Sequence, residues 1–215
     1  MEDDGVVLLH GILRTPLSMV GFARFFKKRG FRVLNLGYPS RKHDLAGLVN
    51  GIHDPIQRFR KTFSGKIHFV GYSMGGLLVR AYLNRYGIRG LGRVVLIGTP
   101  NGGSEVADYL QNRFLYQWVF GPAGQQLITD QRGLADLFAP INADIGIIAG
   151  NKSMPPFGFI MAGRENDGTV SVANTHLMGE KDHLTLPYPH EGLLTSRSVR
   201  EQTLSFLRNG YFAKS

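Results

Sequence analysis

Short apolar runs alternate with longer amphipathic stretches along most of the chain. The runs read as buried strands over residues 6–9, 32–36, 67–72, 94–97, 145–149 and 184–186. The stretches between them predict helices over residues 16–29, 44–61, 75–85, 104–110 and 195–208. This alternation is typical of an α/β fold in which helices cover a mainly parallel sheet.

Proline and glycine mark boundaries within this pattern. Pro16 suits the first turn of a helix, and Gly30 suits the position just past the end of that helix. Pro55 lies inside the next predicted helix and predicts a break or a kink there, because proline has no backbone N–H to donate.

Composition sets limits on the fold and on the chemistry. The 215 residues are 43% hydrophobic, which predicts a single domain over residues 1–215 with a core that needs no disulfide or metal. Cysteine is absent, so a thiol nucleophile, a disulfide and a zinc site with a Cys ligand are excluded.

The formal charge of +9 is concentrated in the first half of the chain. Residues 1–100 hold 16 Lys and Arg against 5 Asp and Glu, whereas residues 101–215 hold 9 against 11. A basic half can attract anionic lipid, nucleic acid or acidic substrates. Because the cations are scattered and no nucleic-acid module surrounds them, we expect no nucleic-acid partner. Peripheral contact with an anionic membrane stays open.

The N-terminus and the hydropathy pattern bear on location. No apolar run approaches the about 18 residues of a membrane helix. The start, Met1-Glu2-Asp3-Asp4, lacks the basic residues and apolar stretch of a secretory signal. The sequence therefore predicts a cytoplasmic protein, although a shortened chain would give the same pattern.

The strongest chemical signal is Gly71-Tyr72-Ser73-Met74-Gly75-Gly76. It fits G-x-S-x-G and lies between a predicted strand and a predicted helix, as a nucleophile elbow does. In such a turn the serine hydroxyl stands above the edge of the sheet, and small residues let neighbouring backbone approach. The motif predicts Ser73 as the nucleophile.

His10-Gly11 follows the first predicted strand. In acyl-transfer enzymes with this order of elements, the loop after that strand supplies one backbone N–H of the oxyanion hole. The residue after the nucleophile supplies the other. This assigns the amides of Ile12 and Met74 to the oxyanion hole, and we expect His10 to support the loop rather than to react.

Three segments together resemble the bacterial lipase branch of the α/β-hydrolase fold. They are Val7-Leu8-Leu9-His10-Gly11, the elbow over residues 71–76, and Gly98-Thr99-Pro100. The resemblance covers almost the whole chain, is greatest for small lipases and extends to hydrolases that remove lipid anchors. It implies a minimal sheet of six strands and a serine esterase or lipase, with no metal or organic cofactor.

A serine nucleophile needs a general base that is itself oriented by an acid. In this fold the acid lies between the serine and the histidine in the chain. Asn166-Asp167-Gly168-Thr169-Val170 resembles the acid loop of the lipases, so we assign the acid to Asp167. Asp144 stands at the wrong end of its predicted strand, and Asp182 lies only eight residues before the preferred base.

His176, His183 and His190 are the late candidates for the base. Catalytic groups of such sheets gather beyond the carboxyl ends of the strands. His190 follows the predicted strand over residues 184–186, whereas His183 precedes it and is kept as the alternative. Pro189-His190-Glu191-Gly192-Leu193-Leu194 also resembles the histidine loop of the lipases. We expect His176 to lie in a surface loop.

Residues 112–140 are a candidate cap or lid over the serine. They include Phe114-Leu115-Tyr116-Gln117-Trp118-Val119-Phe120 and follow the fourth predicted strand, near the place where caps insert in this fold. A helix packed on the sheet is the alternative. Phe157-Gly158-Phe159-Ile160-Met161 can line the pocket or pack in the core.

These assignments predict a Ser-His-Asp hydrolase that forms an acyl-enzyme intermediate on small-molecule or lipid esters. An amidase, a thioesterase or an acyltransferase would use the same triad, because specificity depends on pocket shape. A non-catalytic binding module of the same fold would be favoured by loss of a triad residue, and here all three roles are filled. The sequence predicts no oligomeric state.

Overall fold

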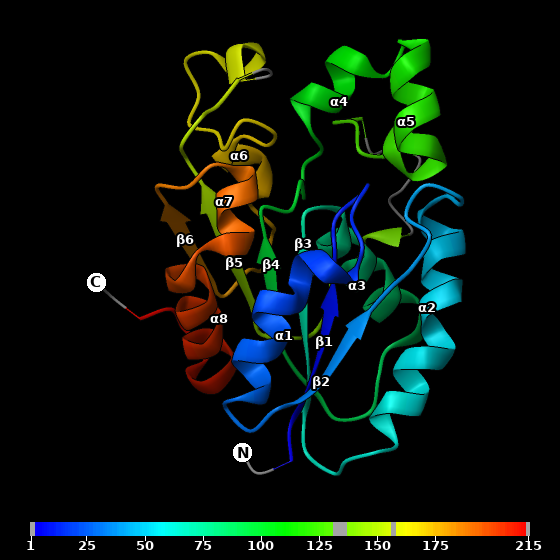
Figure 1. Cartoon of the computed structure of the whole chain (residues 1–215), viewed down its shortest axis with the longest axis vertical. Coiled ribbons are helices and arrows are strands. Elements are labelled where there is room, and N and C mark those ends of the chain that lie inside the picture. The colour runs from blue at the N-terminus through cyan, green and yellow to red at the C-terminus, as the bar shows by residue number, and fades with distance from the viewer. Residues whose placement is uncertain (1–2, 131–136, 156–157, 214–215) are drawn as a thin grey trace.

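The computed structural model describes residues 3–130, 137–155 and 158–213 (Figure 1). The strands of its sheet are β1 (Gly5–Leu9), β2 (Arg32–Leu36), β3 (Ile67–Tyr72), β4 (Leu91–Ile97), β5 (Ile145–Gly150) and β6 (Asp182–Leu186). They are all parallel, in the order β2-β1-β3-β4-β5-β6. The predicted six-stranded parallel sheet is confirmed, and β3 with the elbow lies near its centre.

Helices cover both faces of the sheet (Figure 1). One face carries α1 (Val20–Lys27), α7 (His190–Thr195) and α8 (Arg197–Asn209), and the other carries α2 (Leu45–Arg60) and α3 (Met74–Tyr86). Alternate residues of a strand point to opposite faces. In β1, Val6 and Leu8 therefore pack with α1 and α8, whereas Val7 and Leu9 pack with α2 and α3.

Three short elements lie beyond the carboxyl ends of the strands (Figure 1). They are α4 (Glu105–Leu110), α5 (Phe114–Gln125) and α6 (Val172–Thr175). Ser104 caps α4 by accepting a hydrogen bond from the backbone N–H of Ala107, and Ser171 caps α6 by accepting one from Asn174. The helices α4, α5 and α6 therefore flank the carboxyl ends of the strands, which is where catalytic groups gather in such sheets.

Two of the predicted helices differ in their bounds. The helix expected from residue 16 begins with a 3₁₀ turn over Pro16–Met19 before α1. The final helix expected over residues 195–208 is preceded by the separate helix α7 and begins at Arg197. Ser196 separates the two because its backbone is extended, and its side chain caps α8.

Of the break or kink predicted at Pro55, the structure excludes the break, because α2 continues through this residue. A proline inside a helix costs about 3 kcal/mol. The apolar face of α2, which includes Leu48, Ile52 and Ile56, is buried on both sides of the proline. Burial of each such side chain stabilises the fold by about 1.5–3 kcal/mol, which outweighs the lost hydrogen bond.

None of the helices among the described residues combines the length and the apolarity needed to cross a membrane.

Candidate active site

Ser73 lies at the turn from β3 to α3, with φ 53° and ψ −127°. A positive φ is rare for a residue with a side chain, and such strain is concentrated at functional sites. The glycines of the motif are required by close approach. A Cβ on Gly75 would overlap the carbonyl oxygen of Leu9 in β1, and one on Gly71 would overlap the backbone of Gly76.

The structure brings Ser73, His190 and Asp167 together in one hydrogen-bonded chain. His190 Nε2 lies 3.1 Å from Ser73 Oγ, and His190 Nδ1 lies 2.6 Å from Asp167 Oδ2. All three side chains are buried. Since a carboxylate only accepts, the bond to Asp167 favours a proton on Nδ1 and leaves Nε2 free to take the proton of Ser73.

His190 is the first residue of α7 and is held by several contacts besides the Asp167 side chain. Its backbone N–H donates to the Asp167 carbonyl at 2.9 Å, and Tyr72 Oη donates to the His190 carbonyl at 3.1 Å. Gly98, which follows β4 with φ 54°, lies against the ring: a Cβ there would come within 3.1 Å of His190 Cε1. The imidazole therefore has one well-defined position.

Asp167 belongs to the long connection between β5 and β6. Its Oδ1 accepts hydrogen bonds from the backbone N–H groups of Thr169 at 2.9 Å and Val170 at 2.8 Å, so both carboxylate oxygens are bonded. The chain leaves β5 at Gly150 and returns, since a Cβ on Gly150 would lie 2.9 Å from Asp167 Cβ. The acid thus lies beside the end of a late strand in space, although it does not follow that strand directly in sequence.

The pKa of His190 is raised above its ordinary value. Burial acts against the charged imidazolium, but the negative charge and the hydrogen bond of Asp167 outweigh burial. The stabilised imidazolium is the form that appears when the base has taken a proton.

The loop after β1 lies against Ser73, because a Cβ on Gly11 would come within 3.2 Å of Ser73 Cβ. Met74 is the first residue of α3, so its amide has no acceptor inside the helix. In the described chain the amide of Ile12 donates to no backbone carbonyl. Ile12 lines the same cavity as Ser73, and among the described residues neither predicted amide donates to a backbone carbonyl.

His10 anchors this loop. Its Nδ1 is hydrogen-bonded to the Gly11 carbonyl at 2.8 Å, and its ring stacks on Tyr38 with centroids 4.1 Å apart. The Tyr38 hydroxyl donates to the His10 carbonyl. Burial lowers the pKa of His10, although its bond to Gly11 opposes this, so the neutral form of the ring is favoured. These contacts agree with the supporting role expected for His10.

A cavity of about 450 Å³ opens at Ser73. One wall is apolar and comes from α4, from α5 and the residues just after it, and from the acid loop: Val106, Ala107, Leu110, Phe120, Leu127 and Val170. The candidate cap therefore contributes to the pocket, while Phe114 and Trp118 of α5 are 77% and 67% exposed. Residues 131–136 of the candidate cap lie outside the described residues.

In the second candidate wall, residues 157–161, the structure describes the side chains of Ile160 and Met161 alone. Phe157 lies outside the described residues. Met161 is buried and does not belong to the described lining of the cavity. Met161 instead accepts a hydrogen bond, at its carbonyl, from the Asn166 side chain at 3.4 Å.

Sequence reasoning missed an ion pair at the mouth of the cavity. Arg14 Nη2 pairs with Glu191 Oε1, and both residues line the cavity. Their positions in the sequence could have indicated that both lie near the site. Glu191 directly follows His190, and Arg14 lies two residues after Ile12.

The alternative acid and base residues are engaged elsewhere. His183 Nε2 is hydrogen-bonded to Thr175 Oγ1 at 3.0 Å. Asp144 lies 2.7 Å from Lys181 Nζ and 3.2 Å from Arg93 Nε, and Asp182 accepts from the Phe212 amide at 2.8 Å. In the part of the chain that the structure describes, none of the three residues lines the cavity at Ser73.

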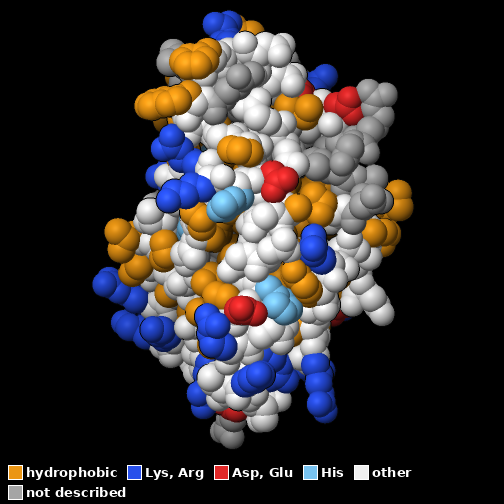
Figure 2. All heavy atoms as spheres, turned by 90° about the vertical axis from the view of Figure 1, so that its right-hand side faces the viewer, with side chains coloured by type: hydrophobic (Ala, Val, Ile, Leu, Met, Phe, Trp, Pro, Cys, Tyr) orange, Lys and Arg blue, Asp and Glu red, His pale blue; other side chains and the backbone are white. Residues whose placement is uncertain are grey.

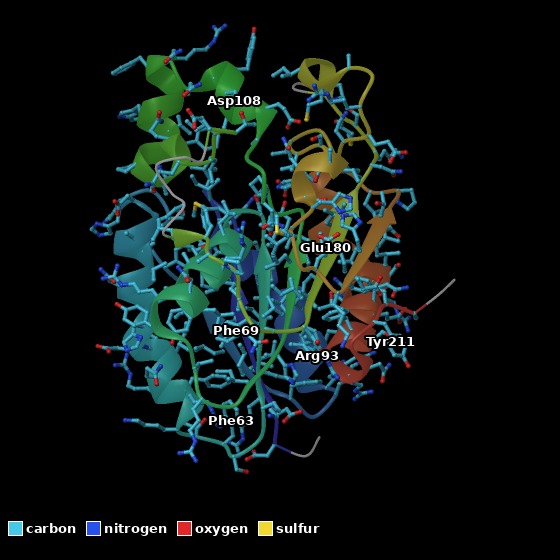
Figure 3. All side chains as sticks on the ribbon, turned by 180° about the vertical axis from the view of Figure 1, so that it is seen from behind. Phe63, Phe69, Arg93, Asp108, Glu180 and Tyr211 are labelled. Carbon is cyan, nitrogen blue, oxygen red and sulfur yellow. The ribbon has the colours of Figure 1, made fainter. Side chains whose placement is uncertain are left out.

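His176, Glu180 and His183 form a cluster whose ligand atoms lie within 4.8 Å of one another, and Figure 3 labels Glu180. Such a donor set suits zinc. The two rings, however, are stacked 3.9 Å apart at an interplanar angle of 15°, so their in-plane lone pairs do not converge on one ion. Glu180 accepts from His176 Nδ1 at 2.6 Å and from the Leu177 amide at 2.7 Å. The cluster fits a hydrogen-bonded link between a loop and β6.

Comparison with protein families matches residues 5–136 to the model of the palmitoyl protein thioesterase family. The matched region contains the Ser73 elbow and the oxyanion loop, and it ends before Asp167 and His190. A comparison with curated protein sequences finds no match.

Solved structures of bacterial and metagenomic hydrolases superpose on the chain. The mature lipase BlEst2 of Bacillus licheniformis has a TM-score of 0.74 at 22% identity, over 98% of this chain and 93% of that one. The metagenomic carboxyl esterase MGS0156 has a TM-score of 0.68 at 20% identity, over 88% and 65%. The esterase EaEST of Exiguobacterium antarcticum has a TM-score of 0.65 at 19% identity, over 96% and 92%. These likenesses establish the α/β-hydrolase fold.

Proposed function

The chain belongs to the palmitoyl protein thioesterase family and is an ester hydrolase of the α/β-hydrolase type. From this premise we propose that it cleaves acyl esters through a triad of Ser73, His190 and Asp167. The observation that carries the proposal is the hydrogen-bonded chain from Ser73 Oγ through His190 to Asp167. Ser73 and His190 line a cavity with an apolar wall. Such a wall suits the alkyl part of an acyl group.

The reaction begins when His190 Nε2 takes the proton of Ser73 Oγ, and Oγ then attacks the carbonyl carbon of the ester. The amides of Ile12 and Met74 stabilise the oxyanion that forms. Collapse of this intermediate breaks the bond to the leaving group, which receives the proton from His190.

A water molecule then completes the cycle. It loses a proton to His190 and attacks the acyl-enzyme carbonyl, and Ser73 Oγ leaves with that proton. Throughout, Asp167 holds the His190 tautomer and stabilises the imidazolium. No step needs a metal or an organic cofactor.

A thioester substrate is the second candidate, and the family match favours it. The same attack and oxyanion serve both reactions, because the ester and the thioester differ only in the leaving atom. A thiolate leaves readily, so thioester cleavage depends less on proton transfer from His190.

We also propose peripheral contact with an anionic membrane, which would bring lipid esters to the site. Lys and Arg side chains dominate the lower half of the face seen from the side of α2 (Figure 2). A shallow groove between α1 and α8 is also basic, with Arg24, Lys28 and Arg29 from α1 and its C-terminal end and Arg197 and Arg200 from α8. The groove between α1 and α8 therefore combines cations from both halves of the chain.

The test is hydrolysis of p-nitrophenyl esters from acetate to palmitate, beside a palmitoyl thioester, by the wild-type protein and by Ser73→Ala. We expect the variant to lose activity by a factor on the order of 10⁶, because the nucleophile is removed. Ser64→Ala is the control, since Ser64 is an exposed serine that precedes β3 and so lies at the opposite end of that strand from Ser73. Retention of activity by Ser73→Ala would overturn the proposal.

A further inference from the structure

A groove continues from the mouth of the cavity. Residues 13–15 and 38–42 line it, and it shares Leu13 and Arg14 with the cavity at Ser73. Its described lining holds three cations, Arg14, Arg41 and Lys42, and no carboxylate. A substrate bound at Ser73 can therefore extend into a basic groove.

The groove lies on the leaving-group side of the cavity. The leaving group takes its proton from His190 Nε2, so it must lie next to that atom. Glu191 directly follows His190, and its carboxylate pairs with Arg14 at the junction of cavity and groove. The apolar side of the cavity is available to the acyl group, along Val106 and Leu110 of α4.

The charge of the groove is only partly balanced. Glu191 neutralises Arg14, which leaves the net positive charge to Arg41 and Lys42, both exposed. Arg41 Nη2 donates to the Trp118 carbonyl at 3.2 Å. This bond uses one of the five guanidinium donors and fixes the position of the group beside α5.

We propose that this groove binds a phosphate carried by the leaving group, so that the preferred substrates are acyl esters of phosphorylated alcohols. The inference rests on the proposed function and names its substrate class. Arginine and lysine side by side are the usual donors to phosphate oxygens. Two unbalanced cations also match the charge of a phosphate monoester, which is close to −2 at neutral pH.

The test compares two soluble substrates with the same acyl chain, 1-octanoylglycerol 3-phosphate and 1-octanoylglycerol. We expect the wild-type kcat/KM to favour the phosphorylated ester about 10-fold at low salt, as two charge-assisted contacts would produce. Added NaCl should reduce this ratio, because salt screens exposed charges.

The double variant Arg41→Gln/Lys42→Gln should bring the ratio close to one. Arg58→Gln/Lys61→Gln is the matched control, because it removes the same charge from an exposed part of α2 and its C-terminal end, and it should keep the wild-type ratio. No preference in the wild type, or an undiminished preference in the double variant, would overturn the inference. Failure of the wild type to hydrolyse either ester would count against the proposed function instead.

Vesicles that contain long-chain 1-acylglycerol 3-phosphate distinguish the source of the phosphate. If the phosphorylated ester is preferred both in solution and in vesicles, and the double variant loses both preferences, the groove binds the phosphate itself, which supports the inference. A preference seen only on vesicles and kept by the double variant overturns the inference, because it would reflect attraction to the surface.

Discussion

At the scale of single residues, the position of His190 is the most strongly determined feature of the site. Asp167 holds it by a side-chain bond and a backbone bond, Tyr72 bonds its carbonyl, and Gly98 makes room for its ring. Asp167 is itself fixed by two amides of its own turn. A base held in this way needs little reorganisation when the serine reacts.

Replacing Asp167 by Asn tests this network. The asparagine side chain retains a carbonyl oxygen for the Thr169 and Val170 amides, but it favours the wrong tautomer of His190. We expect kcat on p-nitrophenyl butyrate to fall by about 10⁴-fold with little change in stability. Asp54→Asn, at an exposed position of α2, should behave as the wild type. A loss smaller than 10-fold would argue against Asp167 as the acid.

The pH dependence of kcat/KM follows from the raised pKa of His190. The base acts in its neutral form, so activity should be low at acidic pH and rise as pH passes the pKa of His190. The midpoint should lie above that of an unperturbed histidine, about 6.5. Asp167→Asn removes the main cause that raises this pKa, so the midpoint of its residual activity should move to lower pH. If the midpoint does not move, a group other than His190 controls the fall of kcat/KM at acidic pH.

Residues within a recognisable motif could be predicted, and residues outside one could not. Ser73 and the amides of Ile12 and Met74 follow from G-x-S-x-G and from His-Gly after a strand. Their catalytic roles stay predictions, although the geometry brings them together. The Arg14–Glu191 pair was missed because it joins a loop near the start of the chain to α7 near its end.

At the scale of elements, the strands were predicted as short apolar runs, and the long helices α2, α3 and α8 were predicted from their amphipathic pattern. Among the short helices, α4 with 6 residues was predicted, whereas α6 with 4 and α7 with 6 were not. The connection from β5 to β6 is held by side-chain bonds to the backbone, as at Asn166, which leave no periodic signal.

Packing of α3 against β1 gives a prediction at this scale. Gly75→Ala places a methyl group against the Leu9 carbonyl, so the helix and the strand must move apart. We expect the free energy of unfolding to fall by about 1–3 kcal/mol, measured by urea denaturation. The matched control is Gly51→Ala in α2, where a Cβ meets nothing within 4 Å and should add about 0.5–1 kcal/mol through helix propensity. A neutral effect at Gly75 would contradict the close approach.

At the scale of the whole molecule, the cation-lined grooves are separate from the apolar wall of the cavity at Ser73. The apolar wall of the cavity comes from α4, α5 and the acid loop, and cations line the groove beside it and the groove between α1 and α8. The charge imbalance was visible in the sequence, but its gathering into grooves was not, because residues of α1 and α8 meet only after folding.

Binding to vesicles tests the proposed membrane contact. We expect the protein to sediment with phosphatidylserine vesicles and not with phosphatidylcholine vesicles, and added salt should release it. Arg24→Gln/Lys28→Gln should weaken binding by roughly 10–30-fold, since each basic residue near such a surface contributes about 1 kcal/mol. Arg113→Gln/Lys152→Gln is the control, because both residues are exposed and lie outside the two basic surfaces. Equal binding to both kinds of vesicle would exclude electrostatic contact.

The position of α4 and α5 has a consequence for how this protein can change over generations. The proposed nucleophile, oxyanion amides, base and acid come from the ends of β1 and β3, from α7 and from the connection between β5 and β6, whereas α4 and α5 form most of the apolar wall. Because the wall and the reacting groups belong to different stretches of chain, mutation can reshape one without disturbing the other. Drift within residues 104–127 is thus a route to new substrate preferences on an inherited reaction.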